Sequence, residues 1–233
     1  MDTERTEAAP EKLWVTIADP EQPAAELARL KIFLERNPSS NLADRPDPIF
    51  QASIEDALSF RIQSAALVDD DGLHICAQGG VFGWAQGRGF EIGGINVATA
   101  YRGLGLQKLL MRTAIVRIVE QDINIVNDPN AAIFAAVADD NEPSWRSIEG
   151  VGFVQAESTD IVWSLIGKSQ DVFTAKGKRL YRFPIERLAV VCAAMAQFAA
   201  DPELRSETRW VRVIFGEALE RYAAPSFFDS FAR

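Results

Sequence analysis

Residues 90–120 limit the fold of this chain more than any other part of its sequence. In residues 90–97, apolar and β-branched side chains surround a glycine pair, a pattern typical of a strand with a bulge. A short glycine-containing segment follows, and residues 104–119 are then apolar on almost every side. Such a pattern predicts a helix that is buried on more than one face. The sequence therefore predicts a strand, a tight turn and a buried helix in direct succession.

The turn is the first candidate for a binding site. Glycines have no Cβ and let a ligand approach the backbone, and the N–H groups at the start of a helix favour an anion such as a phosphate. A tight turn without a ligand is the other interpretation of these residues alone. The spacing matches neither a P-loop, since no Gly-Lys-Ser/Thr follows, nor the dinucleotide Gly-x-Gly-x-x-Gly. The turn residues are Arg102, Gly103, Leu104, Gly105, Leu106 and Gln107.

The wider spacing resembles the GNAT superfamily of acyl-CoA-dependent N-acyltransferases. The motif of that family is a strand ending in a hydrophobic residue, then Arg/Gln-x-x-Gly-x-Gly/Ala opening a long helix. Val97, Arg102 and Gly105 match it, whereas Gln107 departs from its last position. A second family element follows at the expected distance: a buried strand at 131–138, then Asn141, a short helix, Gly152 and Phe153. The resemblance covers roughly residues 13–183.

The resemblance implies acetyl-CoA as the co-substrate and gives several residues a role in binding it. In this fold two neighbouring parallel strands splay apart, and the pantetheine arm fills the gap. The backbone of Asn96 and Val97 would pair with that arm, and residues 102–107 would hold the pyrophosphate. Asn141 has two interpretations, a contact to the coenzyme or a helix cap. No metal is expected, because the only histidine, His74, argues against a zinc site or a histidine triad.

The candidate catalytic residue is Glu91, which lies eleven residues before Arg102. In the histone-acetylating branch of the family, a glutamate at that separation deprotonates the amine through water. The alternative is a surface glutamate at a strand end. Many family members carry a tyrosine four residues before the glycine of Gly-Phe to protonate the leaving thiolate, but this chain has Ile148 there. Two functions stay open: an N-acyltransferase, or a non-catalytic CoA-binding or interaction module acting through its C-terminal extension.

Composition limits the partners. The net charge of −9 argues against nucleic-acid binding and favours an amine-bearing small molecule or protein as the acceptor. The two cysteines, Cys76 and Cys192, are expected in the core rather than in a disulfide, which suggests a reducing compartment. No signal peptide or membrane-spanning run is apparent, so the expected location is the cytoplasm.

The expected fold class is α+β, a mixed sheet with a C-terminal helical extension. We divide the chain into a disordered leader (1–12), the acetyltransferase-like domain (13–183) and a helical pair (184–233). That pair would pack on the parent domain or form a homodimer or partner interface. Further expected elements are strands at 13–17, 65–68, 73–86, 153–155, 161–165 and 178–183, and helices at 20–36 and 52–62.

Overall fold

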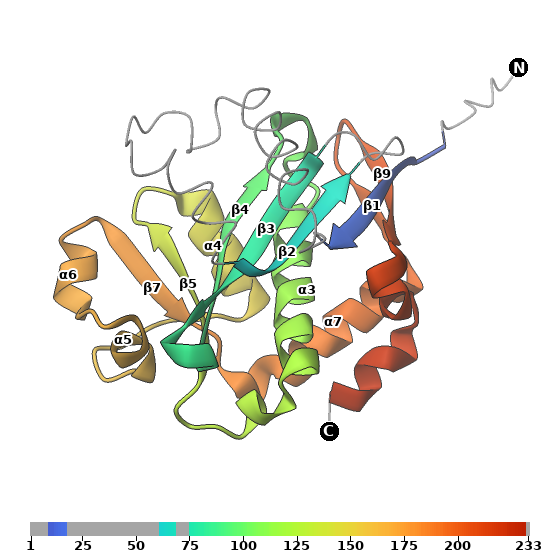
Figure 1. Ribbon diagram of the computed structural model, residues 1–233. Helices are drawn as coiled ribbons and strands as arrows, with labels where there is room; N and C mark the ends of the chain where they lie inside the picture. The colour runs from blue at the N-terminus through green and yellow to red at the C-terminus, as the bar shows by residue number, and fades with distance from the viewer. Residues whose placement is uncertain (1–8, 18–60, 69–74, 232–233) are drawn as a thin grey trace, which may run out of the picture.

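A long mixed sheet forms the body of the protein (Figure 1). The structure is a computed structural model, and it describes residues 9–17, 61–68 and 75–231. Within these residues the strands pair in the order β6-β7-β5-β4-β3-β2-β1-β9-β8. The pairs β4–β5 and β1–β9 are parallel, and the other pairs are antiparallel. The strands are β1 (Glu11–Ile17), β2 (Arg61–Val68), β3 (Ile75–Trp84), β4 (Gly89–Val97), β5 (Ala132–Ala138), β6 (Val154–Gln155), β7 (Lys178–Arg182), β8 (Glu203–Arg205) and β9 (Trp210–Phe215).

The main core lies on the face of the sheet covered by α3, with α4 and α7 beside it (Figure 1). Ile115, Val116 and Val119 of α3 are completely buried, and Met195 of α7 joins the same cluster. A smaller apolar cluster on the opposite face joins α5 to β5 and β7. Cys76 and Cys192 are both buried, as expected. The helices are α3 (Leu106–Gln121), α4 (Glu142–Val151), α5 (Ile161–Ile166), α6 (Gln170–Thr174) and α7 (Leu188–Ala200).

The structure confirms the expected fold class and the central strand, turn and helix, and it corrects the C-terminal extension. Only the first half of the expected helical pair forms an α-helix, α7. Residues 203–215 form the hairpin β8–β9, in which Val211, Val213 and Phe215 alternate with more exposed neighbours. β9 then pairs with β1, and the extension thereby joins the central sheet. Two 3₁₀ segments, Glu217–Ala223 and Pro225–Phe231, complete the chain's described part.

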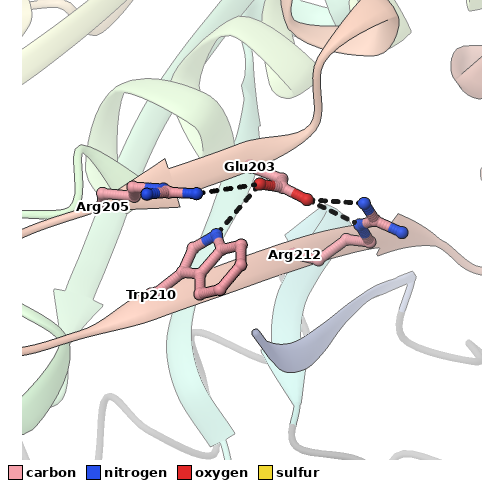
Figure 2. Close-up of polar contacts among 4 residues, drawn as sticks. All are labelled: Glu203, Arg205, Trp210 and Arg212. Carbon is pink, nitrogen blue, oxygen red and sulfur yellow. Dashed lines mark hydrogen bonds and ion pairs between the residues drawn. The ribbon is translucent and has the colours of Figure 1, made fainter. Parts of the chain in front are cut away.

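The strands β8 and β9 are also joined by a cluster of polar contacts around Glu203 (Figure 2). Trp210 Nε1 and Arg212 Nε donate to the Glu203 carboxylate at 3.0 and 3.2 Å. Hydrogen bonds from Arg212 and Trp210 lower the pKa of Glu203. The Arg205 guanidinium lies 4.1 Å from the centroid of the Trp210 ring. These contacts occupy the short edge strand β8, and charged side chains on an edge discourage pairing with other chains.

Three smaller expectations also change. The expected strand at 161–165 is the helix α5, because Val162, Trp163 and Ile166 face one apolar cluster at helical spacing and Gly167 ends the helix in a left-handed conformation. The predicted end of the helix at 52–62 is wrong, because β2 begins at Arg61. The expected leader at 1–12 overlaps β1, which starts at Glu11. Residues 1–8 of the expected leader, residues 52–60, and the expected helix at 20–36 lie outside the described residues.

No helix within the described ranges is both long enough and apolar enough to cross a membrane.

Candidate coenzyme and acyl-transfer site

The parallel strands β4 and β5 separate soon after they begin. They pair only from Gly89 to Glu91 on β4 and from Ala132 to Phe134 on β5. Beyond Glu91, β4 stays paired with β3 as far as Val97, while β5 stays paired with β7 as far as Ala138. Each strand is thus held by its outer neighbour while the two inner edges diverge. Backbone groups on those edges can pair with an extended ligand that carries amides, as in strand addition.

The turn after β4 keeps its glycines exposed and its leucines buried. Leu104 and Leu106 are 4% and 1% exposed and fix the turn to the core. Gly103 and Gly105 have φ values of +83° and +79°, and a Cβ at either position would meet nothing within 4 Å. Glycine adopts this left-handed conformation without strain. The turn is therefore packed against the core on its leucine side and open on its glycine side, where a ligand can approach the backbone.

The N-terminus of α3 points into this open region. Gly105 is the N-cap, and no side chain caps the helix there. The backbone N–H groups of Leu106, Gln107 and Lys108 therefore begin the helix without an intrahelical partner. A helix end of this kind carries about half a positive charge and favours an anion. Exposed Arg102 adds a cation at the start of the turn.

Glu91 lies where β4 and β5 separate. It is opposite Phe82 on β3 and Phe134 on β5, and Trp84 Nε1 donates to its Oε2 atom at 2.9 Å. Phe90 and Ile92 point into the α3-side core, so Glu91 points to the other face of the sheet. Burial raises the pKa of Glu91, although the Trp84 hydrogen bond and the charges of Lys178 and Lys168 act in the opposite direction.

The structure therefore decides between the two positions considered for Glu91. Its side chain is half-buried beside the Trp84 indole and is not a free surface group at a strand end. Sequence reasoning missed Trp84 as its partner. The signal was the hairpin register, because Trp84 lies opposite Gly89 and so projects on the same face as Glu91. That register is set by the turn at 85–88, which single-sequence patterns do not specify, and the irregularity in the β3–β4 pairing comes only after Gly93.

Asn141 and Ile148 both belong to α4. Asn141 is the N-cap of this helix, and its side chain accepts a hydrogen bond from the Ser144 N–H at 3.4 Å. The helix-cap interpretation is thus observed, while a contact to a coenzyme stays a prediction. Ile148 is only 5% exposed and packs in the main core. No proton donor can act from that position.

Comparison with solved structures identifies this arrangement. A strand pair that splays beside a glycine turn and a helix N-terminus offers unpaired backbone groups that can pair with an extended ligand and N–H groups that favour an anion. The structure is similar to a GNAT-family acetyltransferase from Staphylococcus aureus MU50, with a TM-score of 0.54, 16% identity, and coverage of 74% of this chain and 99% of that one. It is also similar to an acetyltransferase from Streptococcus agalactiae 2603, with a TM-score of 0.51, 14% identity, and coverage of 72% and 97%.

These likenesses show that the chain has the GNAT acetyltransferase fold, as the motif at residues 97–105 predicts. No protein-family model and no curated protein matches the sequence.

Proposed function

We propose that this protein is an N-acyltransferase that moves an acyl group, most simply acetyl, from coenzyme A to an amine. One observation carries the proposal: β4, whose pairing with β5 stops at Glu91, leads through the short segment 98–101 into the glycine turn and the N-terminus of α3. A single ligand with an amide-bearing arm and a pyrophosphate would satisfy both features, and acyl-CoA has this chemistry. In the transfer, the amine nitrogen bonds to the thioester carbonyl carbon, the C–S bond breaks, and the thiolate takes up a proton.

We assign different parts of the coenzyme to different residues of this chain. The inner edge of β4 at Asn96 and Val97 would pair with the pantetheine amides. Residues 102–107 would hold the pyrophosphate through backbone N–H groups. The open surroundings of Gly103 and Gly105 support this assignment, because a Cβ there would occupy the ligand's space and not the protein's. Asn141 would reach the coenzyme only by giving up or sharing its capping bond to Ser144.

Glu91 is the residue we assign to proton removal from the amine. A protonated amine is not a nucleophile, so a base must accept a proton before or during attack. The raised pKa of Glu91 moves this carboxylate toward the range in which a base works at neutral pH. Trp84 fixes its orientation. Because Ile148 has no proton to donate, the thiolate would take its proton from water.

The test is acyl transfer by the purified full-length chain, measured as thiol release from acetyl-CoA across a panel of amines. The panel should hold polyamines, amino acids and peptides with free N-termini. General-base catalysis contributes roughly 10²- to 10⁴-fold in rate, so Glu91→Gln should lower kcat by that factor with little change in acetyl-CoA affinity. Glu217→Gln changes an exposed glutamate in a C-terminal 3₁₀ segment and serves as the matched control.

A non-catalytic binding module is the competing function. It would bind acetyl-CoA and show no transfer to any amine in the panel. If Glu91→Gln kept a kcat within a few-fold of the parent across neutral pH, Glu91 would lose its assigned role.

A further inference from the structure

Three segments that are far apart in the sequence meet at the residue that precedes the coenzyme turn. The Tyr101 hydroxyl donates a hydrogen bond to the Glu11 carboxylate of β1. The Arg209 guanidinium, just before β9, forms an ion pair with the same carboxylate. It also lies 4.1 Å from the centroid of the Tyr101 ring. Tyr101, Glu11 and Arg209 therefore form one cluster, and each is only partly exposed.

Tyr101 is placed to control where the turn begins. It ends the 3₁₀ segment Thr99–Tyr101, and its N–H donates to the Ala98 carbonyl at 2.8 Å. Arg102 and Gly103 follow directly. Leu104 and Leu106 fix the turn to the core from its middle onward, but Gly103 comes before the first of them and glycine loses the most conformational freedom on ordering. The side chain of Tyr101 is the anchor on that side.

The hairpin holds Arg209 rigidly against this anchor. The Arg209 N–H donates to Ser206 Oγ at 3.1 Å, and the Ser206 N–H donates to the Arg209 carbonyl at 2.8 Å. Two residues later, Val211 pairs with Glu11 in the parallel ladder. Burial, and next the hydrogen bond to Glu11, raise the pKa of Tyr101 far above its usual value. The hydroxyl therefore stays protonated and remains a donor over the whole ordinary pH range.

We propose that Arg209 is a positioning residue for coenzyme binding: through Glu11 and Tyr101, it sets the placement of residues 102–107 against the pyrophosphate. This inference rests on the proposed function and adds the C-terminal hairpin to that site. Arg209 touches neither the reacting atoms nor the coenzyme. It acts on the backbone N–H groups that do.

The experiment compares Arg209→Ala with Arg205→Ala in the full-length chain. Arg205 stacks on Trp210 at the same 4.1 Å, on the same hairpin, but its carboxylate partner is Glu203 and not the cluster at Tyr101 (Figure 2). A cation–π contact together with a partly exposed ion pair contributes on the order of 1 kcal/mol. Arg209→Ala should therefore raise the dissociation constant of acetyl-CoA about five- to tenfold by calorimetry, and Arg205→Ala should not.

A second substrate separates positioning from general loss of structure. Acetyl-pantetheine carries the same thioester and amide arm but no pyrophosphate. Arg209→Ala should raise KM for acetyl-CoA and leave KM for acetyl-pantetheine and kcat unchanged. Arg209→Lys, which keeps the charge but loses the planar stacking, should fall between parent and alanine variant. Tyr101→Phe keeps the ring and loses the hydroxyl, and it replaces Arg209→Ala if that variant does not fold.

Three results would overturn the inference. The first is unchanged acetyl-CoA affinity in folded Arg209→Ala. The second is an equal loss in Arg205→Ala, which would make the effect a property of the whole hairpin. The third is an equal rise of KM for both thioesters. A parent protein that binds no acetyl-CoA would instead refute the proposed function, and the inference with it.

Discussion

Replacing Gly105 with valine separates the strain of the turn from its role in binding. The residue has φ of +79°, a conformation in which a side chain other than glycine costs roughly 1–3 kcal/mol. Because a Cβ there would meet no protein atom within 4 Å, this strain is the main expected cost to the fold. For a chain of this size, the melting temperature should fall by about 2–12 °C, and the protein should stay folded at room temperature.

The effect on binding should be much larger. The new side chain would stand between the ligand and the N–H groups of Leu106 and Gln107. Loss of two charge-assisted hydrogen bonds costs roughly 3–6 kcal/mol, which weakens acetyl-CoA binding about 10²- to 10⁴-fold. Isothermal titration calorimetry on the folded variant measures this change directly.

Gly87→Val is the matched control, because Gly87 has φ of +88° and equally open surroundings, but lies in the turn at the other end of β4. Both variants should lose similar stability, and only Gly105→Val should lose the coenzyme. If Gly105→Val bound acetyl-CoA within threefold of the parent, the pyrophosphate site would not be at this turn. Equal losses in both variants would attribute the effect to strain alone.

Three further predictions concern stability. Since burial raises the pKa of Glu91, its carboxylate destabilises the fold increasingly as pH rises from about 4.5 through the raised pKa; Glu91→Gln should therefore raise the melting temperature at pH 8, and the gain should vanish in melts below pH 4.5. Met195→Ala should cost about 2–5 kcal/mol in urea unfolding, whereas Val190→Ala, at a position 66% exposed on the same helix, should cost little. Removal of residues 184–233 should cause aggregation in light scattering, because it uncovers the apolar face over α3 and the edge of β1; a soluble monomer would contradict this packing.

The central unit could be predicted from the sequence because its information is local. A bulged strand, a glycine turn and a helix follow one another within residues 89–121, and their buried residues recur at the periods that strands and helices impose. The splaying of β4 and β5 came only from the family resemblance. Nothing in either strand's composition shows that their pairing ends at Glu91.

The C-terminal hairpin could not be predicted in this way. Val211 and Ile214 fit a helical stripe, yet Val211, Val213 and Phe215 fit strand alternation equally well. The choice depends on β1, which offers an open edge at the other end of the chain. The short helix α5 is predicted as a strand because it begins with β-branched residues, which favour strands. Its helical form depends on the packing of Trp163 and Ile166 in one apolar cluster. In both segments a distant partner overrides local preference.

The parallel pairing of β1 with β9 also means that the sheet can be completed only late in synthesis. Glu11 and Arg209 are separated by 198 positions, so β1 leaves the ribosome long before the strand that covers its outer edge exists. Pairings that span most of a chain form late and slowly, and an uncovered strand edge is prone to join other chains in the meantime. The cluster of Tyr101, Glu11 and Arg209 forms in the same late event. A nascent or prematurely terminated chain therefore lacks the completed sheet, and under the proposed role of Arg209 it should also bind acetyl-CoA poorly until β9 is in place.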